Sequence, residues 1–210
     1  MTARTLGRLQ TAIRSCNRCV QQGFIEGAHP ILHGNSRAQV MIVGQAPGPT
    51  AAERPLPYSG ATGRTLQRWL AQAGFEQGAL HDPDRFYLTS VTKCFPGRST
   101  SGSGDRMPSR TEVELCSGHL AGELRLVQPE VILALGRLSI STFLPSHRHE
   151  TLSAIVGYAF PAELPAAGCA LVLPLPHPSG VSRWHNSPRN RERLAQALGW
   201  LDRNRDARKW

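Results

Sequence analysis

The sequence predicts an α/β protein: a single three-layer α/β/α domain around a central, mainly parallel sheet of four strands. Three observations lead to this prediction. The chain has 210 residues, which is enough for one domain with its own hydrophobic core. Short apolar, β-branched runs alternate along it with longer segments whose apolar residues recur at helical spacing. Such alternation favours parallel strands joined by helices that cover both faces of the sheet. We therefore expect residues 1–210 to form one domain.

The first half of the chain supplies two of the predicted strands and two helices. Residues 5–14 have the apolar spacing of a short amphipathic helix. The apolar run 38–44, which is followed by Pro and Gly, predicts a buried strand. Residues 63–73 carry apolar side chains on one helical face, and Gly74 ends that helix. The run 86–92 predicts a second strand.

The middle of the chain begins with a predicted loop. Residues 97–108 are rich in Gly and Ser and are basic, so we expect a flexible segment. Ser109 can cap the helix that follows, with Glu112 three positions later completing a capping box. Residues 130–135 predict a third buried strand, and a short helix follows it as far as Leu144.

The last quarter completes the predicted sheet. Residues 170–173 form its fourth strand, 189–200 the final helix, and 201–210 a basic tail. In sheets of parallel strands, ligands bind at the carboxyl ends of the strands. The loops that follow the first, second and fourth strands are therefore the places to look for a functional site.

The charge of the chain indicates a polyanionic partner. Lys and Arg total 24 against 15 Asp and Glu, a formal net charge of +9. Residues 183–210 hold eight basic and three acidic residues, a local excess of five positive charges. DNA or RNA is the commonest polyanion, although a solvated helix tail has the same composition. The N-terminus lacks the apolar core of a secretory signal, and no apolar run could cross a membrane, so we expect a cytoplasmic protein.

The cysteines predict a metal site. Cys16 and Cys19 form a Cys-x-x-Cys pair, which presents two thiolates to one centre. Cys94, at a predicted strand end, and Cys116, on a predicted helix, can converge on that pair. Spacing does not separate zinc from an iron–sulfur cluster, and a redox pair is disfavoured because the pair precedes the first strand. We expect Cys169 to be a small buried apolar residue.

Four segments occur in a recognisable order. They are Cys16-x-x-Cys19, Gly44-Gln45-Ala46-Pro47-Gly48, Thr92-Lys93-Cys94 and His177-Pro178-Ser179. This order resembles the iron–sulfur (family 4-type) uracil-DNA glycosylases, and the resemblance extends from Cys16 to about Leu194. It implies a DNA-repair enzyme with DNA as its partner and a structural cluster, [4Fe-4S] in type. The cluster ligands that it implies are Cys16, Cys19, Cys94 and Cys116.

The resemblance also implies roles for the residues around an extruded base. Tyr58 stands where an aromatic ring stacks on the base, and Ser90 stands where an Asn reads the base edge. His177 stands at the position of a catalytic histidine that stabilises the leaving base. Gly44, Gln45 and Ala46 would order the attacking water or bind a base carbonyl. The DNA strand would be held by Pro47, Ser179, Gly180, Val181 and Arg183, with Val181 as the wedge that fills the gap.

The chemistry of removing a base from DNA requires the same types of residue. An enzyme that acts on a base within a duplex must swing the nucleotide out and hold the base in a pocket. Cleavage leaves negative charge on the departing base, which a donor from His177 would stabilise. The alternatives are structural: Pro-His-Pro as a rigid turn, and Tyr58 as plain core. We expect His119, His147, His149 and His185 to lie on the surface.

Two residues depart from the family pattern. Gln45 replaces the usual acidic residue, and an amide cannot act as a general base. Ser90 replaces the usual Asn, and offers one hydroxyl where Asn has a donor and an acceptor in a plane. The first hypothesis is therefore a monomeric enzyme that excises uracil or a related deaminated base. The second is a catalytically weak paralogue that binds damaged or single-stranded DNA. A zinc-stabilised nucleotide-binding domain is a third and more distant hypothesis.

Overall fold

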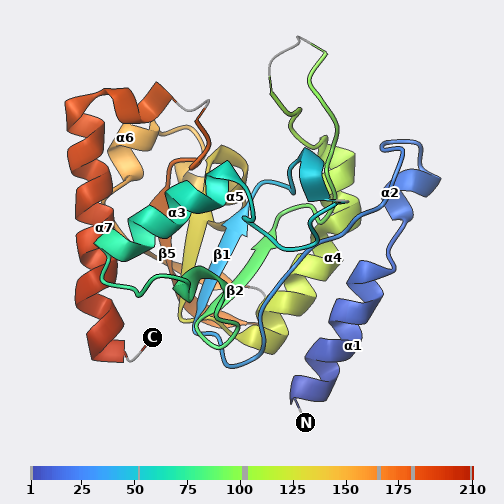
Figure 1. Ribbon diagram of the computed structural model, residues 1–210, viewed down its shortest axis with the longest axis horizontal. Helices are drawn as coiled ribbons and strands as arrows, with labels where there is room; N and C mark the ends of the chain where they lie inside the picture. The colour runs from blue at the N-terminus through green and yellow to red at the C-terminus, as the bar shows by residue number, and fades with distance from the viewer. Residues whose placement is uncertain (1, 52, 101–103, 165–166, 181–182, 209) are drawn as a thin grey trace.

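The computed structural model describes residues 2–51, 53–100, 104–164, 167–180, 183–208 and 210. A central sheet of five strands runs through it in the order β2-β1-β3-β5-β4 (Figure 1). The strands are β1 (Val40–Gly44), β2 (Phe86–Ser90), β3 (Val131–Leu135), β4 (Phe160–Leu164) and β5 (Gly168–Leu175). β1 pairs in parallel with both β2 and β3, and β3 pairs in parallel with β5. The predicted α/β class with a mainly parallel sheet is confirmed.

The fifth strand, β4, is the one that the sequence did not reveal. It pairs antiparallel with β5 at the edge of the sheet, with Ala162 opposite Ala170. Its sequence, Phe-Pro-Ala-Glu-Leu, contains a proline and a glutamate, and only two of its five residues are buried. Proline is tolerated at a sheet edge, where one side of the strand needs no ladder partner. The pairing with β5, rather than local composition, makes this segment a strand.

Helices cover both faces of the sheet. On one face, α3 (Ala61–Gln72) and α7 (Pro188–Arg208) enclose a core with residues of β1, β2, β3 and β5. On the other face, α1 (Thr2–Arg14), α4 (Arg110–Val127), α5 (Arg137–Phe143) and α6 (Leu152–Ile155) contribute to a second core. Figure 1 shows α3 and α7 on one side of the strands and α1 and α4 on the other. The short helix α2 (Arg18–Gln21) follows α1.

The final helix is longer than the sequence indicated. Residues 201–210 were predicted as a basic tail, but α7 continues to Arg208. Leu201 is fully buried, and Trp210 is 8% exposed with its ring 6.4 Å from that of Trp200. Buried apolar residues recur at three- and four-residue spacing up to Leu201, so the helix keeps an apolar face although its composition is basic.

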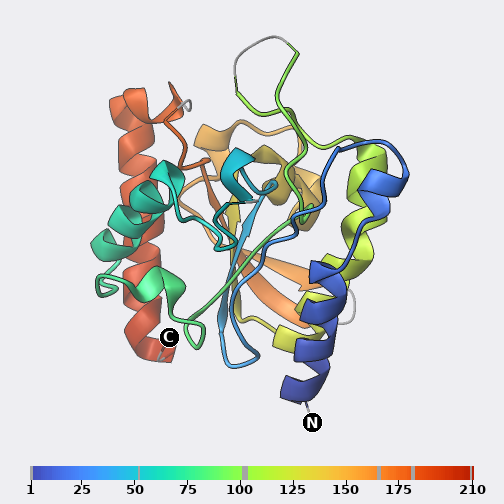
Figure 2. The ribbon, with the colours of Figure 1, turned by 45° about the vertical axis from the view of Figure 1, so that its right-hand side comes forward.

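The predicted capping box is confirmed, and it anchors the loop before α4. Ser109 Oγ accepts from the N–H of Glu112, and the Glu112 carboxylate accepts from the N–H of Ser109. Across the base of the preceding loop, Arg106 N–H donates to Gly97 O at 3.0 Å. The loop projects beyond the sheet in both views (Figures 1 and 2). The described parts of the loop are thus hydrogen-bonded at its base, and the predicted flexibility of 101–103 lies outside the described residues.

Within the described part of the chain, no helix combines the length and the apolar character that a membrane span requires.

Candidate functional site

Four parallel strands end at the same edge of the sheet, and the residues at those ends line one cavity of about 720 Å³. Gln45 follows β1, Ser90 ends β2, Arg137 follows β3, and His177 lies just beyond β5. Their convergence follows from topology, because parallel strands bring their carboxyl ends together. The volume is typical of a site for a small organic ligand. We call this cavity the base pocket, after the extruded base that the resemblance described above implies.

His177 lines the base pocket and has a defined tautomer. Its Nδ1 accepts from the backbone N–H of Ser179 at 3.3 Å, so the proton of the neutral ring sits on Nε2. Burial lowers the pKa of His177, and the nearby charge of Asp105 acts in the opposite direction. The ring also packs over Gly136, where an added Cβ would lie 3.4 Å from Cβ of His177. At neutral pH the side chain is therefore an oriented, uncharged donor.

Tyr58 lies across the end of β1 in a tightly specified position. Its φ of 57° is left-handed, an uncommon conformation for a residue with a side chain. A Cβ at Gly44 would stand 2.7 Å from the Tyr58 hydroxyl, and one at Gly63 would stand 1.5 Å from the Tyr58 carbonyl oxygen. Burial raises the pKa of Tyr58, so the phenol stays protonated. The ring is half-buried against the core and lines the pocket, as a stacking surface would.

Ser90 and Gln45 lie on adjacent strand ends that are joined by hydrogen bonds. Val91 N–H donates to Gly44 O at 2.9 Å, and Thr92 N–H donates to Gln45 O at 3.1 Å. The buried hydroxyl of Ser90 donates to Thr92 O at 2.7 Å. Because its hydrogen is used there, Ser90 Oγ presents acceptor lone pairs to a ligand.

The structure brings most of the predicted site residues together. Those that line the base pocket are Gly44, Gln45, Ala46, Pro47, Tyr58, Ser90, His177 and Ser179. Gly180 and Arg183 are exposed and do not line it. Val181, the predicted wedge, lies outside the described residues.

Four charged residues of the base pocket were not singled out from the sequence: Arg54, Arg98, Asp105 and Arg137. Arg137 comes two positions after the third predicted strand, so extending the carboxyl-end rule to that strand would have found it. The other three come from long loops, where no local pattern indicates which residue turns toward the site.

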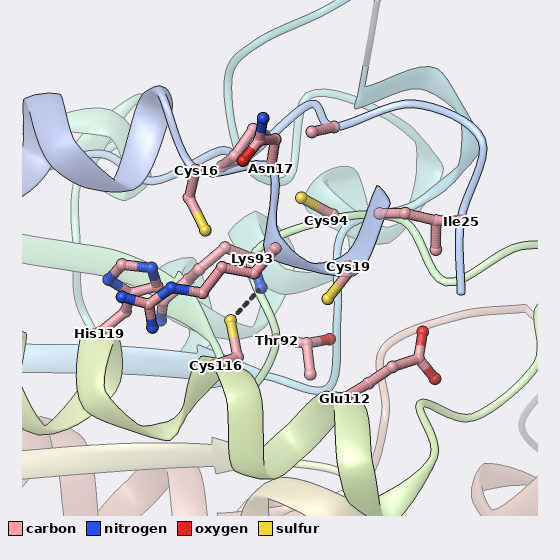
Figure 3. A pocket seen from close by; sticks show the side chains of 13 residues that line it. Cys16, Asn17, Cys19, Ile25, Thr92, Lys93, Cys94, Glu112, Cys116 and His119 are labelled. Carbon is pink, nitrogen blue, oxygen red and sulfur yellow. Dashed lines mark hydrogen bonds between the residues drawn. The ribbon is translucent and has the colours of Figure 1, made fainter. Parts of the chain in front are cut away.

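The predicted cysteine quartet lines a second, much smaller cavity of about 20 Å³, which we call the cysteine pocket. Figure 3 shows the sulfur atoms of Cys16, Cys19, Cys94 and Cys116 turned toward a common space. Burial raises the pKa of Cys94 to about 12, and it also raises the pKa of Cys116. Cys116 Sγ accepts from the backbone N–H of Lys93 at 3.3 Å. The two pairs, far apart in sequence, are thus gathered in space.

Two predictions about single side chains were wrong. Cys169 was expected to be buried, but it is exposed near the start of β5, where it pairs with Glu163 of the edge strand β4. His119 was expected on the surface, but it is 8% exposed and lines the cysteine pocket. Its Nε2 is buried and has no hydrogen-bond partner among the described atoms. Both errors arise because packing between distant segments decides exposure.

A buried ion pair lies between the two pockets. Lys93 Nζ is 2.6 Å from Glu123 Oε2, and the two side chains are 1% and 0% exposed. The same ammonium donates to Thr89 Oγ1 at 2.7 Å and to Ser90 O at 2.5 Å. Tyr87 donates to the other carboxylate oxygen of Glu123 at 3.1 Å. Lys93 thereby connects the end of β2 to α4, with all three of its donors used.

An open cavity at the carboxyl ends of parallel strands, with an aromatic surface and an oriented donor, defines an α/β ligand-binding or catalytic site. Comparison with known proteins narrows this class. Residues 32–201 match the model of the uracil DNA glycosylase superfamily. The match includes the whole of the base pocket except Ile31, together with Cys94 and Cys116. The chain therefore belongs to the uracil DNA glycosylase superfamily.

Curated relatives agree with this assignment. The chain is 30% identical over 180 residues to a type-4 uracil-DNA glycosylase of Pyrobaculum aerophilum, covering 85% of each protein. It is 31% identical over 131 residues to one from Archaeoglobus fulgidus, covering 60% of this chain and 57% of that protein. It is 32% identical over 129 residues to one from Saccharolobus solfataricus, covering 61% and 54%.

Proposed function

We propose that this protein is a DNA-repair glycosylase that excises uracil, or a related deaminated base, and leaves an abasic site. Membership of the superfamily and the relatives named as type-4 uracil-DNA glycosylases support this activity. The observation that carries the proposal for this chain is the oriented Nε2–H of His177 in the base pocket.

In this proposal, different residues of the base pocket have different roles in excision. A base that has left the duplex loses its stacking partners, and the ring of Tyr58 replaces part of that contact. Ser90 Oγ accepts from an N–H on the base edge, as found on uracil but not at the unprotonated N3 of cytosine. As the glycosidic bond breaks, negative charge builds on the base. The donor on His177 then forms a stronger hydrogen bond, which lowers the barrier.

DNA is the proposed partner, and exposed arginines at the mouth of the base pocket support it. Arg54, Arg98 and Arg137 line the cavity and are all exposed, so they can meet phosphates. Ser179 and Gly180 continue from His177 and offer backbone donors for the strand, with Arg183 as a further cation. We propose a monomer acting on its own. We also propose a cytoplasmic location, because thiols that serve as metal ligands must stay reduced.

We propose that the cysteine pocket holds an iron–sulfur cluster of the [4Fe-4S] type, with Cys16, Cys19, Cys94 and Cys116 as ligands. All four thiols line one cavity, and they come from three separate segments of the chain. A cluster takes one thiolate on each iron and so spans wider gaps than zinc. The orphaned Nε2 of His119 suits the same occupant, since sulfides accept hydrogen bonds. The cluster would tie the segment around α2 to α4.

The alternative is a paralogue that binds damaged or single-stranded DNA and cleaves it weakly. Gln45 favours this alternative. With Gln at this position, the loop after β1 brings an amide into the pocket instead of the carboxylate that is usual in the family. The two functions differ in turnover, not in binding.

A single-turnover assay separates them. Anaerobically purified protein is mixed with labelled oligonucleotides that carry one uracil, hypoxanthine, xanthine or no lesion, and alkali then breaks abasic sites. We expect cleavage of the uracil strand and none of the unmodified strand. Cluster-loaded protein that binds these DNAs and cleaves none of them would contradict the enzyme and favour the paralogue.

The variant His177→Ala tests the observation that carries the proposal. Loss of one preorganised donor lowers rates by about 10²–10³-fold in comparable sites. We expect a fall of that size in the single-turnover rate, with DNA affinity little changed. A rate equal to that of the wild type would remove His177 from the chemical step.

A further inference from the structure

The base pocket contains a carboxylate that no motif around the strand ends supplies. Among the described residues that line it, Asp105 is the only Asp or Glu. It comes from the long loop between β2 and α4, which projects over this edge of the sheet (Figure 2). The residue of the pocket that follows β1, Gln45, carries an uncharged amide instead.

The backbone around Asp105 is held from both sides. Arg98 and Asp105 face each other as a bridge pair, with Arg98 Nη1 at 3.3 Å from Asp105 Oδ1. The next residue, Arg106, donates from its guanidinium to both oxygens of Glu112 at 2.7 and 2.8 Å. Glu112 is 3% exposed and belongs to the capping box of α4. The position of Asp105 is thus tied to a rigid helix end.

Asp105 and His177 both line the base pocket. The charge of Asp105 raises the pKa of His177 and opposes the effect of burial, so the two groups are electrostatically close. Hydrolysis of an N-glycosidic bond places positive charge on the sugar and negative charge on the departing base. A carboxylate stabilises the first and can take a proton from water, and a neutral donor stabilises the second. The pocket offers one group of each kind.

We propose that Asp105 is a catalytic residue, the carboxylate that faces C1′ of the flipped nucleotide and accepts a proton from the attacking water. This inference rests on the proposed glycosylase function. The C1′–N1 bond breaks and its electron pair leaves with the base, while the water oxygen bonds to C1′. One water proton passes to Asp105, which later releases it to solvent, and the base anion takes a proton from solvent. The reaction consumes one water and yields the free base and an abasic site.

The test is the isosteric variant Asp105→Asn, assayed for single-turnover cleavage of uracil-containing DNA with enzyme in excess. General-base catalysis contributes about 10²–10⁴-fold, so the rate should fall by at least about 100-fold. Affinity for the same oligonucleotide, measured by fluorescence anisotropy, should change by less than about threefold, because the lost group acts on the transition state. The double variant Gln45→Glu/Asp105→Asn returns a carboxylate to the same cavity. It should recover at least about tenfold of the lost rate.

Two controls separate chemistry from structure. Asp84→Asn removes a carboxylate that pairs with Arg37 in the same manner as Asp105 pairs with Arg98, but it does not line the pocket, and it should cleave as the wild type does. The second control compares hydrogen exchange in residues 104–108 between the wild type and Asp105→Asn, and the two proteins should exchange equally. If Asp105 served only to hold the loop, the loss of rate in Asp105→Asn would come with faster exchange in this segment, and the inference would be wrong.

Failure of the inference and failure of the proposed function look different. A wild-type protein that cleaves no uracil would overturn both. A wild-type protein that cleaves uracil while Asp105→Asn retains its rate would overturn the role of Asp105 alone.

Discussion

The two pockets of this protein share one strand end and differ in nearly every physical property. The cysteine pocket is about 20 Å³ and the base pocket about 720 Å³, and residues of the segment 89–94 line both of them. Successive side chains of a strand point to opposite faces. The Thr89 hydroxyl therefore donates to Glu123 of α4, although Thr89 also lines the base pocket with Ser90. Thr92, Lys93 and Cys94, which follow the strand, line the cysteine pocket. The end of β2 and the residues after it thus border a large cavity and a small one.

Charge follows the same division. Near the cysteine pocket, Lys93 and Glu123 are almost fully buried and are paired at 2.6 Å. At the base pocket, Arg54 and Arg137 are exposed around an open cavity, and Arg98 is exposed although it pairs with Asp105 at 3.3 Å. Buried charges must be paired, whereas exposed cations remain available to a polyanion. This difference fits the proposed roles of the two pockets, a structural one for the cysteine pocket and DNA binding for the base pocket.

The largest expected effect is on the cysteine pocket. Cys116→Ser removes a thiol from the quartet and should abolish the visible absorbance of the anaerobically purified protein, because a serine hydroxyl is a poor cluster ligand. Hydrogen exchange should rise in residues 16–30, which the cluster would tie to α4. Cys169→Ser is the matched control, since Cys169 is exposed and lies outside the pocket. Unchanged absorbance in Cys116→Ser would exclude it from the ligand set.

A smaller but still large effect is expected for the ion pair between the pockets. Glu123→Ala leaves the Lys93 ammonium buried without its counter-ion, which costs about 3–5 kcal/mol of unfolding free energy in comparable pairs. The double variant Lys93→Met/Glu123→Leu removes both charges and should recover most of that loss. Urea denaturation with matched protein concentrations measures both. A Glu123→Ala loss below about 1 kcal/mol, the range of exposed pairs, would show that the pair is effectively solvated.

The smallest effect is expected in the base pocket. Ser90→Ala removes one acceptor from the base edge and leaves the fold intact, so the free energy of base recognition should change by about 1 kcal/mol. The measurement is the single-turnover rate on uracil-containing DNA, which should fall by about fivefold relative to the wild type. Equal rates in the two proteins would mean that Ser90 does not read the base.

Local patterns were enough for most of the framework. Apolar, β-branched runs predicted β1, β2, β3 and β5, and the Ser109–Glu112 capping box was found at its predicted place. Periodicity and capping are properties of a few neighbouring residues, so they can be read without knowing the partner segments. The same reasoning placed Gln45, Ser90 and His177 at strand ends, where the structure brings them into one cavity.

Long-range packing decided the rest. β4 is a strand because β5 pairs with it, and α7 reaches Arg208 because Leu201 and Trp210 join the core beside it. The position of Asp105 depends on a bridge to Arg98 and on the anchoring of Arg106 by Glu112.

The sequence by itself therefore determined the fold class, the cysteine quartet and the strand-end motifs, because each depends on residue type and short spacing. The tertiary structure alone decided that His119 is buried beside the cysteines and that Asp105 lies in the base pocket. Those two placements arise from contacts between segments that are remote in the chain, and no local pattern records such contacts.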